Sequence, residues 1–562
     1  MAFIRIYEQD ALLDAQQSID YIIVGGGLVG CVIATRLAQA DLSSSVLLIE
    51  AGTDPRNNED TKTPAGALAL HNSDLDWAYM STPQKNLNGR TIYNAAGRGL
   101  SGGTNINYGA WARGDARDWN AWAKAIGDDS WNYENMLPFF RKTETHYNPK
   151  ADPRQHGFDG PIHYNLASTA HPDAPFPLRE QIFKAFIELG LKPIEDGNAG
   201  ETEGVFELGQ AWRDGKRQPA AIAYGLNGVK VLLETMVHRV LFDKTAEGTP
   251  TAIGVELVGG RKILAKKEVI VSAGAIRSTQ ILKLSGIGAS SELQQHGIDV
   301  VVDNSDVGRN CFDHYTVFQF WKLRKPEDGL AVGPLWTNPG YLTTMPLEWC
   351  ANESVPKDVL KKAFAADGVE IEDDNPYLAL THYKIILAYA PMVADWIGAD
   401  IPVDGSHIAT ATMLQHPTSR GEVRLHSTNP IDPPLINANY CDTEVDRLIL
   451  NQGTRRATTL MLETAAMKET IQGETPPRGM EPVTSNSRRE VIETRVRSCG
   501  HTLFHLSGSL PMGKVVDSKF QVKGVNGLRV ADASIMPSPI SSPIQAPLYA
   551  VGERVAETIL KG

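Results

Sequence analysis

The amino-acid sequence predicts an α/β protein in which a discontinuous Rossmann-like dinucleotide-binding domain is joined to an α+β second domain that contains an antiparallel sheet. Three observations predict this fold class. Residues 21–50 read as strand, glycine-rich turn, helix and strand, residues 268–285 repeat the strand, turn and helix, and roughly residues 315–500 lack this alternation. At 562 residues, the chain has the length of two joined domains rather than one small domain.

The first turn has the glycine spacing of a dinucleotide-binding site. Gly25, Gly27 and Gly30 form a G-x-G-x-x-G pattern between an apolar strand and an apolar helix. Gly25 permits a tight turn, Gly27 lets the backbone approach a pyrophosphate, and Gly30 lets the helix pack closely against the sheet. The phosphates would then meet the N-terminus of a helix.

An acidic residue ends the second strand of this unit. Glu50 follows Gly30 by twenty residues, where a carboxylate accepts hydrogen bonds from both hydroxyls of an adenosine ribose. The same carboxylate would repel a 2′-phosphate. The pattern therefore favours FAD or NAD over NADP.

Further segments of the nucleotide-binding domain follow later in the chain. Residues 268–285 repeat the strand, turn and amphipathic helix, and residues 527–532 form a short strand that delivers Asp532 at its carboxyl end, where ligands lie in doubly wound sheets. Pro547 is predicted to open a last helix, where its missing N–H costs nothing. One apolar stripe of this helix is ordinary core: Leu548, Val551, Val555 and Ile559.

The middle of the chain predicts the second domain. Residues 377–383 and 422–425 are strand-like, and we interpret them as parts of an antiparallel substrate-domain sheet. The domain boundary is therefore discontinuous. The nucleotide-binding domain is assigned to residues 1–160, 215–315 and 500–562, and the substrate-binding domain to residues 161–214 and 316–499.

Composition excludes several classes of partner. The formal net charge of −12, without a basic stripe, argues against nucleic acid. No apolar run reaches membrane-spanning length, and the charged N-terminal stretch does not resemble a signal peptide, so we expect no membrane association and a cytoplasmic location. The five scattered cysteines fit reduced thiols better than disulfides or a metal site, and Cys31 is expected in the core.

Several motifs occur together in a fixed order. After the first turn come GRGLSGGTNIN at residues 97–107, ARG at 112–114, SAGA at 272–275, SGIG at 285–288, and His505 ahead of the Met-Gly pair at 512–513. With these motifs, nearly the whole chain resembles the glucose-methanol-choline (GMC) family of FAD oxidoreductases. The resemblance implies FAD rather than NAD, with the isoalloxazine against the 98–107 loop. Glycines and small residues in this loop leave room for the isoalloxazine to approach its backbone.

The resemblance also implies a set of FAD-binding positions. Val237 would meet adenine through its backbone, Asp532 would approach the pyrophosphate and ribitol through backbone or water, and Trp77 is either a cofactor contact or ordinary core. Ile106 stands where some family members carry a histidine bonded covalently to FAD, so the flavin is expected to be noncovalent. The implied cofactor positions are Gly25, Gly27, Leu28, Gly30, Glu50, Ala51, Trp77, Arg98, Gly102, Thr104, Asn107, Val237, Asp532, Ala533 and Gln545.

His505 matches the catalytic base of the family. Oxidation of an alcohol by a flavin requires removal of the hydroxyl proton as a hydride leaves the carbon, and a neutral imidazole is a suitable base. His314 and His501 are assigned structural roles. Phe504, Tyr108 and Pro543 are expected in the substrate pocket, and four further aromatic residues either line an aryl pocket or pack elsewhere: Trp336, Tyr341, Trp349 and Trp396.

Pro543 departs from the family pattern. The family normally places His or Asn at this second catalytic position, whereas proline offers neither a titratable group nor a backbone donor.

Three functions remain compatible with this sequence. The first is oxidation of an activated, aryl or allylic alcohol, and the alternative is a redox-neutral lyase or cyclase with structural FAD. A noncatalytic FAD-stabilised binding protein is least favoured. The sequence does not identify the small-molecule substrate. It is compatible with oxygen or another compound as electron acceptor, and with a monomer or a homodimer.

Overall fold

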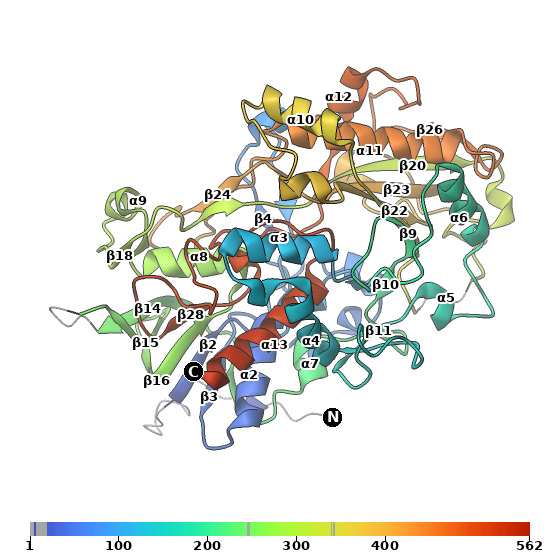
Figure 1. Cartoon of the computed structure of the whole chain (residues 1–562). Helices are drawn as coiled ribbons and strands as arrows, with labels where there is room; N and C mark the ends of the chain where they lie inside the picture. Colours follow the sequence, from blue (N-terminus) through green and yellow to red (C-terminus); the bar gives the residue numbers. More distant parts are fainter. Residues whose placement is uncertain (1–4, 7–18, 244–247, 339, 341–342) are drawn as a thin grey trace.

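The computed structural model describes residues 5–6, 19–243, 248–338, 340 and 343–562 (Figure 1). Most of the N-terminal stretch used above against a signal peptide, and Tyr341, lie outside these residues. Within the described residues, no helix is both long and apolar enough to cross a membrane.

A mainly parallel sheet forms the first layer, at the lower left of Figure 1. Among the described residues its order is β1-β13-β3-β2-β16-β15-β14, with β28 pairing on β16. The pairs from β1 to β16 and the β16–β28 pair are parallel, and β14 and β15 extend the sheet antiparallel. The strands are β1 (Arg5–Ile6), β2 (Ile19–Val24), β3 (Val46–Ile49), β13 (Val229–Leu232), β14 (Val237–Asp243), β15 (Thr251–Leu257), β16 (Lys262–Val271) and β28 (Leu528–Val530).

The centre of this sheet is buried, and helix α2 (Leu28–Ala40) packs against it. β3 is buried along its whole length, as expected of a central parallel strand. Helix α2 packs against α13 (Gln545–Lys561), and a Cβ on Gly552 would lie 3.0 Å from the Cβ of Val32. Cys31 is fully buried there, as predicted. The helices are α2 (Leu28–Ala40), α3 (Ala116–Ile126), α4 (Tyr133–Thr143), α5 (Ala167–Ala170), α6 (Arg179–Glu188), α7 (Ala220–Tyr224), α8 (Gly274–Leu284), α9 (Ser290–Gln295), α10 (Lys357–Ala366), α11 (Glu444–Leu462), α12 (Arg489–Cys499) and α13 (Gln545–Lys561).

An antiparallel sheet forms the second layer, at the upper right of Figure 1, and α11 packs against it. Its described strands run in the order β26-β20-β23-β22-β21-β9, with β27 pairing on β20. These two sheets confirm the predicted fold class. The strands are β9 (Gly204–Glu207), β20 (Tyr315–Leu323), β21 (Leu347–Glu353), β22 (Tyr383–Ala388), β23 (His407–Leu414), β26 (Ile471–Thr475) and β27 (His501–Thr502).

The described residues also form several smaller sheets. One of them joins β24 (Gly421–Arg424) to β19 (Arg309–Cys311) and β25 (Leu435–Asn437), which confirms the strand predicted at 422–425 but places it outside the larger antiparallel sheet. The other pairs are β4 (Tyr79–Met80) with β5 (Tyr93–Asn94), β6 (Ala110–Trp111) with β10 (Gly209–Gln210), β7 (Glu144–Thr145) with β8 (Ile162–His163), β11 (Trp212–Arg213) with β12 (Lys216–Arg217), and β17 (Ile287–Gly288) with β18 (Val302–Asp303).

The structure corrects two local predictions. The strand predicted at 377–383 is wrong, because Pro376–Ala379 forms a short 3-10 helix and the strand begins only at Tyr383. Asn375 accepts a hydrogen bond from the backbone N–H of Tyr377 at 3.0 Å, and the proline fixes the helical start. Pro547 does not open the last helix but is its third residue, still within the first turn, whose N–H groups have no partner within the helix.

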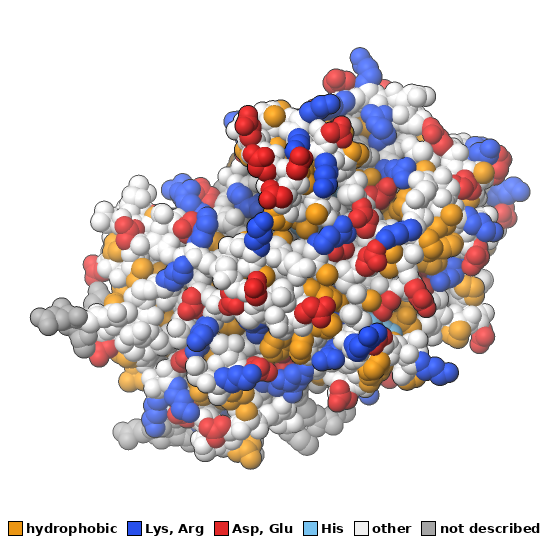
Figure 2. Space-filling model, viewed as in Figure 1, with side chains coloured by type: hydrophobic (Ala, Val, Ile, Leu, Met, Phe, Trp, Pro, Cys, Tyr) orange, Lys and Arg blue, Asp and Glu red, His pale blue; other side chains and the backbone are white. Residues whose placement is uncertain are grey.

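The surface view shows how charge is distributed. On the face drawn in Figure 2, acidic and basic side chains are interspersed, with apolar side chains between them. No continuous basic stripe of described residues crosses this face, which is consistent with a net charge of −12.

Candidate functional site

One cavity of about 440 Å³ reaches from the glycine-rich turn to residues of the antiparallel sheet. Its volume lies in the usual range for small-molecule and cofactor sites. The cavity brings together most of the residues that the sequence singles out. They are Gly25, Gly27, Leu28, Glu50, Ala51, Trp77, Gly102, Thr104, Asn107, Tyr108, Val237, Phe504, His505, Asp532, Ala533, Pro543 and Gln545.

The glycine turn is shaped by close backbone packing. A Cβ on Gly25 would lie 2.4 Å from the carbonyl oxygen of Ser272, and one on Gly30 would lie 2.1 Å from that of Gly25. Gly27 is different, because the nearest atom to an added Cβ would be 3.8 Å away. Gly25 and Gly30 are therefore needed for packing, while Gly27 leaves an open cradle beside the cavity. Gly30 itself does not line the cavity.

Glu50 ties the turn to the end of β3. One carboxylate oxygen accepts the backbone N–H of Gly26 and the other that of Gly52, both at 2.8 Å. Burial raises the pKa of Glu50, and these N–H groups partly offset that rise. Glu50 also lines the cavity, where its carboxylate suits the proposed ribose hydroxyls.

The loop around Gly102 also lines the cavity. A Cβ on Gly102 would lie only 2.8 Å from the Cα of Gly27, so the two glycine loops meet backbone to backbone. The hydroxyl of Thr104 donates to the carbonyl of Ser101 at 2.7 Å and accepts the N–H of Ala220 at 3.0 Å. Thr104 therefore shapes the loop. Together with Gly27 and Glu50, this glycine-lined cradle fits an FAD molecule.

Asp532 uses its carboxylate within the protein. It accepts hydrogen bonds from the N–H of Ser534 at 2.8 Å, the N–H of Gly274 at 2.9 Å and the hydroxyl of Ser278 at 2.5 Å. These bonds join the end of β28 to the start of α8. A side chain engaged in this way supports the expectation that any contact with the cofactor runs through backbone or water.

Two aromatic-cation contacts flank the cofactor region. Trp77 lines the cavity, and the guanidinium carbons of Arg98 and Arg277 lie 5.0 and 4.5 Å from the centre of its ring. Arg98 is exposed and does not line the cavity. Its place in the cofactor site stays a prediction.

His505 lies beside a second histidine that sets its tautomer. Nε2 of His314 lies 3.1 Å from the carbonyl oxygen of Gln415. A carbonyl oxygen only accepts hydrogen bonds, so Nε2 carries the single proton of the neutral His314 ring. Nδ1 of His314 is then an acceptor, 2.9 Å from Nδ1 of His505, which must donate. Nε2 of His505 therefore has a free lone pair. The structural role expected for His314 becomes that of a positioning residue.

The surroundings keep both imidazoles neutral. Burial lowers the pKa of His505 to about 4, with a smaller contribution from the positive charge of Lys384. Burial also lowers the pKa of His314 well below its ordinary value, and His505 adds to this effect. The neutral form of His505 is the form that can accept a proton.

A buried carboxylate holds the His505 loop. Asp313 accepts the backbone N–H of His505 at 2.9 Å, the hydroxyl of Tyr440 at 2.6 Å and the hydroxyl of Thr502. Burial raises the pKa of Asp313 to about 6. Phe504, which precedes His505, has a left-handed backbone with φ of 64°, so His505 follows a tightly constrained turn.

Pro543 lines the same cavity as His505. Its loop is anchored behind the cavity, because Ser541 donates to Asp118 through both its N–H, at 2.9 Å, and its hydroxyl. The side chain at position 543 thus presents only hydrocarbon to the site, as the sequence predicts.

The structure shows which of the remaining aromatic and histidine residues line the cavity. Trp396 lines the cavity, whereas Trp336 and Trp349 do not. Trp349 donates a hydrogen bond to the carbonyl of Arg179 at 3.0 Å, and Trp336 packs against Phe176. His501 packs 5.5 Å from Trp396, ring centre to ring centre, outside the cavity lining. Sequence reasoning missed His71, Asp313 and Gln415, because no local motif marks a residue whose partner is brought to it only by folding.

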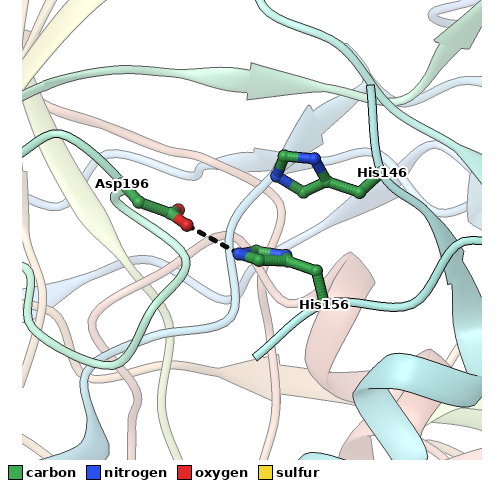
Figure 3. Close-up of side chains that lie close together, drawn as sticks. All are labelled: His146, His156 and Asp196. Atoms are coloured by element: carbon green, nitrogen blue, oxygen red, sulfur yellow. Dashed lines mark hydrogen bonds and ion pairs between the residues drawn. The ribbon is translucent and has the colours of Figure 1, made fainter. Parts of the chain in front are cut away.

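A separate cluster of His146, His156 and Asp196 lies outside the cavity (Figure 3). Nε2 of His156 points at Asp196 with a separation of 2.6 Å, and Nδ1 lies 2.9 Å from Glu144, which also pairs with Arg113. Burial lowers the pKa of His156, but the two carboxylates raise it further, to a value above the ordinary one. Both ring nitrogens are thus satisfied within an ion network, and we assign the cluster a structural role.

The sequence and the fold of this chain are similar to those of known oxidoreductases. The models for the N- and C-terminal parts of GMC oxidoreductases match residues 19–316 and 417–552. The GMC-type oxidoreductase acuG of Aspergillus aculeatus is 40% identical over 547 residues, covering 97% of this chain and 99% of that protein. Pyridoxine 4-oxidase from Mesorbium loti has a TM-score of 0.82 at 28% identity, covering 97% and 100% of the two chains. A variant of Aspergillus oryzae formate oxidase, studied for FAD modification, has a TM-score of 0.86 at 28% identity, covering 97% and 98%.

Proposed function

Because this chain belongs to the GMC oxidoreductase family, whose members bind FAD, we propose that it oxidises an activated, aryl or allylic alcohol to a carbonyl compound. The observation that carries this proposal is the free Nε2 lone pair of His505 in the cavity that also contains the glycine cradle. The similarity to an oxidase of pyridoxine supports a ring-bearing alcohol as substrate.

In the proposed reaction, His505 takes the proton of the substrate hydroxyl at Nε2. His314 holds the imidazole ring through Nδ1, and the carbonyl of Gln415 holds His314 in turn. Bound FAD supplies the hydride acceptor, so that one proton and one hydride leave the alcohol and a C=O bond forms. We propose that Gly27, Gly102, Glu50 and Val237 would hold this cofactor, and that oxygen or another acceptor would finally take up the two electrons.

Pro543 supports an activated substrate. With no donor at this position, the developing charge on the substrate oxygen loses one contact, which is worth about 10² to 10³ in rate at comparable sites. An aryl or allylic neighbour stabilises the reacting carbon and reduces the need for that contact. The same observation favours a second candidate, a redox-neutral lyase or cyclase in which FAD is structural and His505 performs acid-base chemistry.

Anaerobic mixing of the FAD-loaded protein with alcohols separates the two candidates. We expect benzylic or allylic alcohols to bleach the flavin band, and ethanol to act far more slowly. Readmission of air then shows whether oxygen restores the band. Persistence of the oxidised spectrum with every activated alcohol, together with conversion of a substrate without flavin reduction, would support the redox-neutral candidate.

The flavin is proposed to be noncovalent. Ile106, at the position where a histidyl bond to FAD occurs in similar proteins, has no nucleophilic atom. Acid or heat denaturation of the yellow protein is therefore expected to release intact FAD into the supernatant, as measured by chromatography and absorbance. Flavin that remained with the precipitated polypeptide would contradict this prediction.

Glu50→Ala is expected to weaken FAD retention about tenfold, because it removes the carboxylate from the ribose region and leaves two backbone N–H groups without their acceptor. The dissociation constant of FAD measures this effect by fluorescence. Glu50→Gln is the matched control, since its amide oxygen keeps one acceptor. Equal retention in all three proteins would remove Glu50 from the site.

The domain limits also remain a proposal. The described strands of the parallel sheet all fall within residues 1–160, 215–315 and 500–562. Those of the antiparallel sheet fall within 161–214 and 316–499, apart from Tyr315 and the two-residue β27. This distribution supports the proposed division.

A further inference from the structure

A chain of four side chains leads from a buried carboxylate to the cavity. The hydroxyl of Tyr93 donates to Asp76, Nδ1 of His71 lies 3.0 Å from the Tyr93 oxygen, and Nε2 of His71 lies 2.8 Å from the hydroxyl of Tyr108. His71 and Tyr108 line the cavity, whereas Tyr93 and Asp76 do not.

Asp76 sets the direction of every hydrogen bond in this chain. Its carboxylate accepts backbone N–H groups from Asn72 at 3.0 Å and from Ala78 and Ala96 at 2.9 Å, so it also accepts the Tyr93 hydroxyl. Tyr93 has then spent its only proton, and its oxygen must accept Nδ1–H of His71.

His71 passes this direction on to Tyr108. Burial lowers the pKa of His71 although Asp76 opposes the shift, so the ring is neutral at pH 7 and carries one proton, at Nδ1. Nε2 therefore accepts, and the Tyr108 hydroxyl donates to it. Tyr108 retains a lone pair on its oxygen but has no proton to offer to a ligand.

This acceptor lies at the end of the cavity that holds the base. The ring of His71 lies 5.3 Å from that of Phe504, the residue before His505, and 4.8 Å from that of Trp396. The cavity-lining side chains that pack in one cluster with Trp396 are apolar, including Phe318, Leu347 and Met392. An oriented acceptor with apolar neighbours discriminates strongly between ligands that do and do not carry a donor.

We propose that Tyr108 binds a second hydrogen-bond donor of the substrate, so that this site selects ring-bearing alcohols with an additional O–H or N–H group. The proposal rests on the proposed alcohol oxidation and names its substrate class. Tyr108 is the specificity-determining residue, and His71, Tyr93 and Asp76 are positioning residues that act through it.

Matched pairs of substrates test this acceptor. The 2-, 3- and 4-hydroxybenzyl alcohols are compared with the corresponding methoxybenzyl alcohols, which have similar electronic effects on the ring but no donor there. For the best-fitting ring position, wild type is expected to prefer the hydroxy compound in kcat/KM by about fivefold to tenfold, the usual value of one such hydrogen bond. Tyr108→Phe is expected to reduce this ratio to about one.

Tyr93→Phe tests the orientation of the Tyr108 hydroxyl without changing a residue that lines the cavity. His71 then loses the acceptor that keeps its proton at Nδ1, so the proton can move to Nε2 and the Tyr108 hydroxyl becomes free to donate to a methoxy oxygen. The preference for the hydroxy compound is expected to fall toward one through a gain on the methoxy compound. A role of this chain in packing alone would lower both activities together and leave the ratio unchanged.

Binding provides a readout that does not depend on turnover. Hydroxybenzaldehydes have no hydroxyl at the reacting end, so their preference over methoxybenzaldehydes reports the second donor only, measured as dissociation constants from flavin absorbance. If no alcohol reduces the flavin but this preference disappears in Tyr108→Phe, the proposed oxidation fails and the acceptor role stands. If alcohols reduce the flavin and the ratios are the same in wild type and Tyr108→Phe, the acceptor role is overturned.

Discussion

Replacing His505 with alanine is expected to lower the rate of flavin reduction by an activated alcohol by about 10² to 10⁴, the range for loss of a general base. The physical reason is the free lone pair on Nε2, which is the acceptor that the His314 contact leaves in the cavity. FAD content is expected to stay near that of wild type. Single-turnover kinetics under anaerobic conditions measure the chemical step separately from product release.

The pH dependence of wild type is part of the same prediction. The pKa of His505 is lowered to about 4, so its neutral form predominates above that pH. As the pH rises through this range, kcat/KM is expected to increase and then stay level, because the deprotonated imidazole is the active form. His505→Ala should lose this rise, and added imidazole should restore part of the rate. A variant with wild-type rates would place the base elsewhere.

Replacing His314 with phenylalanine is expected to lower the same rate by about 10 to 10² without loss of FAD, because the hydrogen bond that selects the reactive tautomer of His505 is removed. Without that acceptor, the proton of His505 can occupy Nε2 and block proton transfer. The variant also leaves the carbonyl of Gln415 without its donor.

His314→Gln is the matched control for this prediction. Its amide oxygen can accept Nδ1–H of His505 and its amide N–H can donate toward Gln415, so a part of the rate should return. The thermal midpoint of each variant is measured alongside. Equal rates in His314→Phe and wild type would assign His314 to packing, as the sequence alone suggests.

The sequence determined the cofactor-binding half of this protein to a large extent. The steric requirement at Gly30 is local, because the backbone of Gly25 imposes it, and Gly25 itself has a φ of 102° that favours glycine within the turn, so their spacing predicts the turn directly. The alternation of strand and helix, and the ordered motifs that identify the family, can also be recognised from the sequence alone. The strand predicted at 377–383 is wrong because an Asn-Pro turn signal outweighed the apolar pattern there.

Only the tertiary structure decided how the proposed catalytic histidines are protonated and which hydrogen-bonding groups face the proposed substrate site. His314 and His505 are separated by 191 residues, and His71 and Tyr108 by 37, so no local pattern indicates that they touch. A single imidazole has two tautomers of similar energy, and the choice between them depends on which partner folding brings to each nitrogen. The sequence therefore determined which residues are available for chemistry. The fold determined which atoms give protons and which accept them, because hydrogen-bond direction depends on the whole network rather than on any one residue.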